Sequence, residues 1–292
     1  MTERTRLCWV PAALLWLSGC AALSPRSSSA ALDLDPIVRA CYQPTSESVS
    51  SPSQGVGSCQ RCGLESPAPG IVFVIDGAGG FEAASRTMRQ TIAELKMPLE
   101  VRSFRWTHGY CRVLSDQIHA AHLRRAGQKL AELVLNCQQE APARPIYLVG
   151  HSAGCGVVLV AAEQLPPNTL QRIVLLAPAV SSKRDLRGAL RSSCQGIDAF
   201  ISNRDWCCLG LGTLLTGTTD RCWLTGAAGK TGFQPIIASP QDEALYAKLR
   251  QYPWEPSLIW TGHRGGHYGS YQPGFLRAFV LPLFQESVAC GP

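Results

Sequence analysis

A serine that could act as a nucleophile lies at the centre of the pentapeptide Gly-His-Ser-Ala-Gly at 150–154. The pentapeptide directly follows the apolar run Ile-Tyr-Leu-Val at 146–149 and directly precedes a second apolar stretch. A sharp turn from a strand into a helix exposes such a serine, and glycines on either side let the backbone bend tightly. The pattern predicts that Ser152 is a nucleophile; the alternative is a glycine-rich turn whose serine only caps the helix.

An acid and a base that could serve Ser152 follow it along the chain. Asp205 lies three to four residues beyond a predicted strand at 197–201, where its carboxylate could orient an imidazole. Two histidines that could act as the base come further along the chain: His263, and His267, which follows a pair of glycines and precedes the last predicted helix. A histidine titrates near neutral pH and can therefore take the serine proton and return it to a leaving group.

Other titratable residues fit these roles less well. Asp198 lies inside the predicted strand, and Asp220 lies far beyond it. His119 and His122 fall on a predicted helix, where a surface or packing role is expected. His108 follows a strand and is expected to line the pocket.

The elements that must position these residues alternate from Gly70 onward between short apolar runs and helical stretches. We expect six strands, at 71–75, 99–106, 146–149, 172–176, 197–201 and 258–261, and helices at about 82–96, 116–139, 154–165, 184–191 and 274–284. Continuous apolar strands between helices predict a doubly wound α/β domain whose mostly parallel sheet is covered on both faces. The segment 206–256 is expected to be an irregular excursion, and its aromatic stretch 252–254 to wall a pocket.

The elbow-like pentapeptide and the order serine, acid, histidine resemble the α/β-hydrolase superfamily over residues 70–285. The resemblance implies a minimal α/β-hydrolase fold without a large cap, and the triad Ser152, Asp205 and His267. It also implies an oxyanion hole made by the backbone N–H groups of Ala78 and Ala153. The loop 76–80 departs from the family by carrying Asp76 in place of the frequent histidine.

No cofactor is implied by the sequence. Residues 226–231 end like a phosphate-binding loop, but Leu224 stands where the first glycine is required. Cys59 and Cys62 have the spacing of half a zinc site, and no second ligand pair accompanies them, so no metal site is expected.

The first 20 residues are typical of an export signal, with Arg4 and Arg6 before an apolar run at 7–17. The Leu-Ser-Gly-Cys sequence at 17–20 resembles the lipobox of bacterial lipoproteins, which implies lipid attachment at Cys20 and a place in the cell envelope. Ordinary secretion and an uncleaved anchor are the alternatives. We therefore expect a signal peptide at 1–19, a tether and irregular cysteine-containing lead-in at 20–69, and a hydrolase domain at 70–292.

Export changes how the 13 cysteines are interpreted. Without Cys8 and Cys20 eleven remain, and most should be paired in an oxidising compartment. Because eleven is odd, at least one is free or intermolecular.

The composition narrows the function. Apolar residues make up 46% of the 292 and charged residues 16%, which excludes a disordered or coiled-coil chain. The net charge of +6 is spread without a basic patch, so nucleic acid is a poor partner. We expect an exported, lipid-anchored serine hydrolase that acts on a small-molecule or lipid ester through an acyl-enzyme. The alternatives are an acyltransferase with the same triad and a catalytically silent lipoprotein of this fold that binds ligands or envelope partners.

Overall fold

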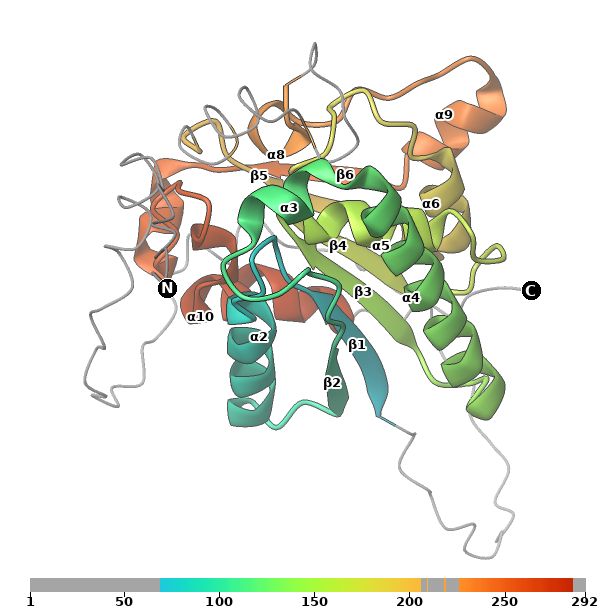
Figure 1. Cartoon of the computed structure of the whole chain (residues 1–292), viewed down its shortest axis with the longest axis horizontal. Coiled ribbons are helices and arrows are strands. Elements are labelled where there is room, and N and C mark those ends of the chain that lie inside the picture. Colours follow the sequence, from blue (N-terminus) through green and yellow to red (C-terminus); the bar gives the residue numbers. More distant parts are fainter. Residues whose placement is uncertain (1–68, 206–208, 210–217, 219–225, 286–292) are drawn as a thin grey trace, which may run out of the picture. The chain divides into compact units, whose positions relative to one another are not determined.

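The computed structural model describes residues 69–205, 209, 218 and 226–285 (Figure 1). The predicted export signal, Cys20 and nearly all of the predicted tether lie outside these residues, as does Asp220. Within the described part, none of the helices has the length and apolar character needed to cross a membrane.

Six parallel strands form one sheet, as predicted. They are β1 (Gly70–Ile75), β2 (Leu99–Ser103), β3 (Ile146–His151), β4 (Arg172–Leu176), β5 (Ile197–Ile201) and β6 (Leu249–Pro253). The order across the sheet is β2-β1-β3-β4-β5-β6. The chain therefore moves outward from β1 to β2, returns beside β1 as β3, and continues in the other direction. Loops at the carboxyl ends of β1 and β3 diverge at this switch point, which is where open α/β sheets bind ligands.

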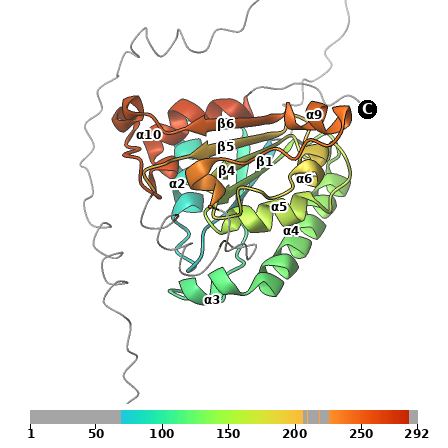
Figure 2. The same ribbon diagram turned by 90° about the horizontal axis from the view of Figure 1, so that it is seen from above.

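Helices cover both faces of the sheet, which confirms the doubly wound arrangement (Figure 2). The helices are α2 (Ala83–Glu94), α3 (Val113–Ile118), α4 (Ala120–Glu140), α5 (Gly154–Ala162), α6 (Arg187–Ser192), α8 (Ala228–Thr231), α9 (Pro240–Tyr246) and α10 (Pro273–Phe275). Side chains alternate along a strand, so Ile71, Phe73 and Ile75 of β1 pack with α4, α5 and α6. Val72 and Val74 pack on the opposite face with α2 and α10. Both faces are buried, which explains why the central strands are continuous apolar runs.

The last strand differs from the prediction. The apolar run at 258–261 belongs to a 3-10 helix, Pro256–Thr261, which begins with a proline and ends at Gly262 with a φ of 88°. Trp260 in this helix is 93% exposed. The sixth strand is instead β6, which lies at the edge of the sheet and is only partly buried. An edge strand packs against fewer neighbours, so β6 lacks the apolar run that identifies the central strands, and the predicted excursion at 206–256 was too long.

Two predicted helices are interrupted. The helix expected at 116–139 is divided into α3 and α4 at His119, whose φ and ψ are −93° and 73°. The helix expected at 274–284 consists of α10, a π-helical turn at Leu276–Val280 and a 3-10 helix at Leu281–Phe284. Pro282 lacks an N–H group and accounts for the change in helix type at the end.

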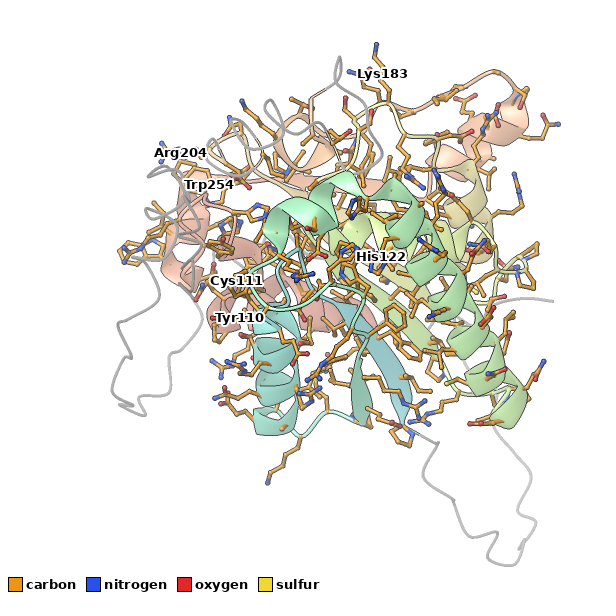
Figure 3. The ribbon with its side chains drawn as sticks, in the orientation of Figure 1. Tyr110, Cys111, His122, Lys183, Arg204 and Trp254 are labelled. Atoms are coloured by element: carbon orange, nitrogen blue, oxygen red, sulfur yellow. The ribbon has the colours of Figure 1, made fainter. Side chains whose placement is uncertain are left out.

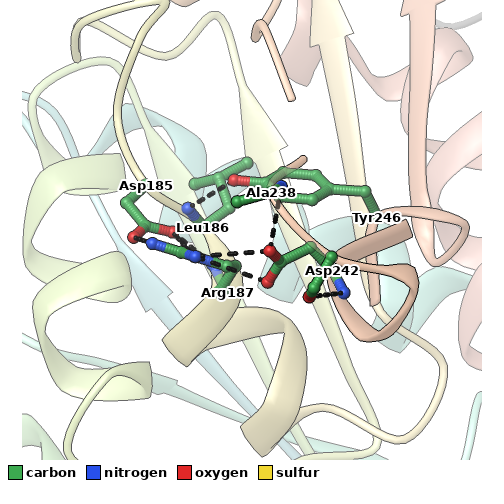
Figure 4. Close-up of polar contacts among 7 residues, drawn as sticks. Asp185, Leu186, Arg187, Ala238, Asp242 and Tyr246 are labelled. Carbon is green, nitrogen blue, oxygen red and sulfur yellow. Dashed lines mark hydrogen bonds and ion pairs between the residues drawn. The ribbon is translucent and has the colours of Figure 1, made fainter. Parts of the chain in front are cut away.

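Helices α6 and α9 are joined by polar contacts at the surface (Figure 4). The Arg187 guanidinium pairs with Asp185 at 2.6 Å and with Asp242 at 3.4 Å. The Tyr246 hydroxyl accepts the backbone N–H of Leu186 at 3.2 Å. These contacts hold α9 immediately before the edge strand β6.

Candidate active site

Ser152 lies on a sharp turn between β3 and α5, with a φ of 53°. Positive φ is rare for a residue with a side chain and marks a backbone that its surroundings hold in place. A Cβ on Gly150 would lie 2.7 Å from the Cα of Cys155, and a Cβ on Gly154 would lie 2.3 Å from the carbonyl oxygen of Ile75. Both glycines of the pentapeptide are therefore required because backbone from α5 and β1 approaches them closely.

The structure brings Ser152, His267 and Asp205 into one hydrogen-bonded chain. His267 Nε2 lies 2.8 Å from Ser152 Oγ, and His267 Nδ1 lies 2.5 Å from Asp205 Oδ2. A carboxylate only accepts hydrogen bonds, so Nδ1 carries the proton and Nε2 offers its lone pair to the serine hydroxyl. Asp205 and His267 are 2% and 7% exposed. This arrangement is suited to removing the proton from Ser152.

Asp205 is held in place by its own loop. Its N–H donates to the carbonyl of Ser202 at 3.2 Å, and its Oδ1 accepts the N–H of Leu209 at 3.3 Å. Ser202 also donates its hydroxyl to the carbonyl of Gly265 at 2.6 Å. The loop that carries the acid is thereby bonded to the loop that carries His267.

The loop around His267 has a second support from the residue after β6. The indole N–H of Trp254 donates to the carbonyl of His263 at 2.8 Å. The Arg204 guanidinium carbon lies 4.7 Å from the centre of the Trp254 ring, and Figure 3 shows these two side chains side by side. Trp254 thus supports the histidine loop, and Tyr252 donates its hydroxyl to Asp198 at 2.8 Å within the sheet. That this aromatic stretch also walls a pocket stays a prediction.

His263, the alternative base, is buried, and its side chain makes contacts that shape its own loop. Its Nδ1 accepts the N–H of Gly265 at 3.1 Å, and its ring packs edge-on against Phe275 with 4.9 Å between centroids. Burial lowers the pKa of His263 to about 4. The side chain therefore stays neutral and shapes the loop next to His267.

Asp198, the alternative acid, belongs to a buried ion network. Its carboxylate accepts hydrogen bonds from Arg172 at 2.8 Å and from Arg250 at 2.7 Å. Asp198 is fully buried near the start of β5, whereas Asp205 follows the carboxyl end of that strand. The network joins β4, β5 and β6 and contributes to the sheet.

The loop after β1 lies against Ser152. A Cβ on Gly77 would lie 3.1 Å from the Ser152 Cβ. Asp76, which departs from the family pattern, accepts the N–H of Ala84 at 2.7 Å and so caps α2; burial raises the pKa of its carboxyl. The N–H groups of Ala78 and Ala153 donate no hydrogen bond to any group in the described part of the chain. They remain available for an oxyanion.

Asp116 supports the same loop, and the sequence did not single it out. It is 1% exposed, its Oδ2 accepts the N–H of Gly79 at 2.8 Å, and its Oδ1 accepts the backbone N–H of His108 at 2.7 Å. A lone aspartate in a helix of six residues carries no local signal of such a contact. His108, expected to line the pocket, stacks on His122 with 3.9 Å between centroids and lines a cavity of about 480 Å³ with His119.

Three cysteines among the described residues are free thiols: Cys111, Cys137 and Cys155. Cys155 is buried in α5 directly after the elbow, and burial raises the pKa of its thiol. It is part of the hydrophobic core between β1 and α5. Apart from Cys194, the other cysteines expected in disulfides lie outside the described residues, so their pairing stays a prediction.

A family model described as serine aminopeptidase, S33, matches residues 108–206, which include Ser152 and Asp205. The parallel strand order, the strained serine after β3 and this match agree on one fold. The chain has the α/β-hydrolase fold.

Solved structures of α/β hydrolases and esterases resemble the chain. A putative hydrolase of the α/β superfamily from Xanthomonas campestris pv. campestris is 16% identical, with 74% of this chain and 99% of that chain covered and a TM-score of 0.40. Esterase PE8 is 15% identical, with 73% and 94% covered and a TM-score of 0.45. A cutinase from Trichoderma reesei is 19% identical, with 55% and 72% covered and a TM-score of 0.37. No curated protein matches the chain in sequence. The strand order and the elbow, rather than these distant likenesses, decide the assignment of the α/β-hydrolase fold.

Proposed function

We propose that the protein is a serine hydrolase that cleaves an ester or a related acyl bond through Ser152, His267 and Asp205. The observation that carries the proposal is the hydrogen-bonded chain from Asp205 through His267 to a serine held at positive φ. If Ser152 only capped α5, its role would not explain the positive φ or the buried histidine and carboxylate aligned with its hydroxyl.

Acylation begins when Ser152 Oγ attacks the acyl carbon and His267 Nε2 takes the hydroxyl proton. The carboxylate of Asp205 stabilises the imidazolium that forms. The N–H groups of Ala78 and Ala153 donate to the tetrahedral oxyanion. Each such donor lowers the activation free energy by about 3 kcal/mol. The bond to the leaving group then breaks, and its oxygen takes the proton from His267.

Deacylation reverses these roles with water as the acceptor. His267 Nε2 removes a proton from water as the oxygen attacks the acyl-enzyme carbonyl, and the second tetrahedral intermediate releases the acid and restores the Ser152 hydroxyl. An acceptor alcohol in place of water would make the same site an acyltransferase. The name of the matched family, serine aminopeptidase, makes an aminoacyl amide the second substrate class to test.

Fluorophosphonate labelling tests this function directly. We expect the purified chain without residues 1–19 to be labelled, the Ser152→Ala variant to be unlabelled, and Ser192→Ala to be labelled like the parent. Ser192 is a suitable control because its hydroxyl bonds the carbonyl of Ala189 within α6. Absence of labelling in the parent, or labelling of Ser152→Ala, would overturn the proposal in favour of a catalytically silent binding protein.

Substrate assays then separate the reaction classes. A series of aryl esters of increasing acyl length and a series of aminoacyl aryl amides are offered to the same preparation. Faster turnover of esters supports an esterase, and faster turnover of the amides supports an aminopeptidase. Ester product in the presence of an added alcohol identifies acyl transfer.

We further propose that the protein is exported and anchored to the cell envelope by lipid at Cys20. The support is the apolar run at 7–17 that stops at Leu-Ser-Gly-Cys. Metabolic labelling with an alkyne fatty acid should mark the wild-type protein and leave Cys20→Ala unmarked. Equal labelling of both would contradict attachment at Cys20.

A further inference from the structure

His151, the residue before the nucleophile, lies between three segments of the active site. It ends β3 and is 5% exposed. Its Nε2 lies 3.2 Å from the backbone carbonyl oxygen of His267, and the two imidazole centroids are 4.9 Å apart. On its other side, Nδ1 would lie 3.2 Å from a Cβ placed on Gly77, in the loop that approaches Ser152. His151 thus contacts the loop that carries the base and lies beside the loop that carries Ala78, one of the two proposed oxyanion donors.

The hydrogen bond to His267 determines the tautomer of His151. A carbonyl oxygen only accepts, so Nε2 carries the proton and donates it, and Nδ1 is left unprotonated beside Gly77. The charged and titratable groups that face His151 are His267, Asp205, Tyr268 and Tyr271. Burial, helped by the neighbouring His267, lowers the pKa of His151 to about 3, so the ring is neutral at neutral pH.

Two hydrogen bonds therefore hold His267, and they act on different parts of it. Asp205 binds the side chain at Nδ1, and His151 binds the backbone carbonyl. A bond at Nδ1 alone leaves the imidazole free to move with its backbone, away from Ser152. Fixing the backbone as well leaves Nε2 aimed at Ser152 Oγ. Misplacing a catalytic group by about 1 Å can cost about a hundredfold in rate.

We propose that His151 is a positioning residue that, through its Nε2–H donor, holds the backbone of His267 so that the imidazole faces Ser152. This inference rests on the proposed hydrolase function and deepens it. The sequence pattern treats this position of the pentapeptide as variable, and only the contact with His267, 116 residues away, distinguishes it.

Two amide substitutions separate the donor from the rest of the side chain. In glutamine the amide nitrogen is as many bonds from the Cα as the histidine Nε2, so His151→Gln can donate to the same carbonyl. In asparagine the amide nitrogen is as many bonds from the Cα as Nδ1, so in His151→Asn it reaches toward Gly77 instead. Tyr147→Phe is the matched control, because Tyr147 is buried on the same strand and donates its hydroxyl to the carbonyl of Phe284 at 3.1 Å, away from the triad.

Steady-state kinetics of the best ester and the rate of fluorophosphonate inactivation test the proposal. We expect His151→Asn to lower kcat and the inactivation rate by about tenfold to a hundredfold with KM within about twofold. His151→Gln should recover most of this loss, and Tyr147→Phe should match the wild type. His151 is neutral, so its replacement by glutamine removes no charge from the site. The pH at which kcat/KM falls on the acidic side should therefore be the same in His151→Gln and in the wild type.

The outcomes distinguish this inference from the proposed function. An active wild type with His151→Asn at the wild-type rate, or with Gln and Asn equally impaired, overturns the role of His151 alone. A wild type that neither hydrolyses nor labels overturns both. If His151→Asn does not fold, as judged by thermal unfolding, the Gln variant decides: wild-type kcat supports the donor role, and a loss of kcat above tenfold overturns it.

Discussion

The Asp116 carboxylate accepts the backbone N–H of Gly79 at 2.8 Å and so joins α3 to the loop that follows β1. Its other oxygen accepts both the backbone N–H and the ring Nδ1–H of His108, each at 2.7 Å. A buried carboxylate with three donors is well compensated. The loop between Ile75 and Gly80, which carries the proposed oxyanion donor, is therefore bonded to α3 at Gly79.

Asp116→Asn should weaken catalysis more than it weakens folding. The asparagine oxygen can still accept from Gly79, but its NH₂ group then faces the two donors of His108, and the loop must shift to relieve that conflict. We expect kcat/KM for the best ester to fall by about tenfold, equivalent to about 1.4 kcal/mol. Asp185→Asn, at the surface beside Arg187 (Figure 4), is the control. Equal activity of both variants would contradict the role of Asp116.

Asp205→Asn should lower kcat by about 10⁴-fold while the protein remains folded. An asparagine amide cannot accept from Nδ1–H in the same way as a carboxylate, so the imidazole adopts the tautomer that leaves Nε2 protonated and unable to act as a base. Asp198→Asn is the comparison, since it disturbs a buried ion network and should lower the denaturation midpoint rather than kcat. A larger loss of kcat in Asp198→Asn would move the acid to that residue.

Gly154→Ala should destabilise the fold severely. The new Cβ would lie 2.3 Å from the carbonyl oxygen of Ile75 and 2.5 Å from that of Asp76, and backbone atoms cannot turn aside as a flexible side chain can. We expect a loss of at least about 3 kcal/mol of unfolding free energy, measured by urea denaturation. Gly226→Ala, whose Cβ would lie 3.4 Å from a Thr231 side-chain atom, should stay near the wild type. Similar midpoints for the two variants would refute this account of the elbow.

The stability of the fold should depend on pH through His263. Burial lowers its folded-state pKa to about 4, whereas the unfolded chain has the ordinary value of 6.5. Below pH 6.5 the unfolded state binds the proton first, so the stabilisation present above pH 6.5 is lost as the pH falls toward 4. The slope per histidine is at most about 1.4 kcal/mol per pH unit.

Urea midpoints measured between pH 7 and pH 4 test this dependence. His263→Gln retains an acceptor for the N–H of Gly265 and removes the titration, so its midpoint should fall less steeply than that of the wild type. His151, whose pKa in the folded state is about 3, also takes up a proton more readily in the unfolded state over this pH interval. Because His151 is unchanged in His263→Gln, the variant keeps this part of the pH dependence. Identical slopes for the wild type and His263→Gln would show that His263 binds its proton equally in both states.

Much of the fold was predictable because its signals are local. Four of the six strands, β1, β3, β4 and β5, are largely apolar runs buried on both faces, and the elbow combines a serine with two glycines that only a tight turn requires. Ser152 and Asp205 follow strands, as expected, whereas His267 follows the 3-10 helix Pro256–Thr261 and was chosen on the order of serine, acid and histidine that the family resemblance implies. β6 was missed because an edge strand that carries Arg250 and Tyr252 for a buried ion network has no apolar pattern.

The sequence by itself determined the alternation of strands and helices, since this depends on the periodic burial of neighbours along the chain. It also singled out Ser152 through the local Gly-x-Ser-x-Gly pattern, and Asp205 and His267 through the resemblance of their loops to a known family. The tertiary structure alone decided how that site is supported. Asp116 meets Gly79 across 37 residues, Ser202 meets Gly265 across 63, and His151 meets His267 across 116. Hydrogen bonds between single distant groups leave no repeating trace in a sequence, and only the packed sheet and its loops bring their partners together.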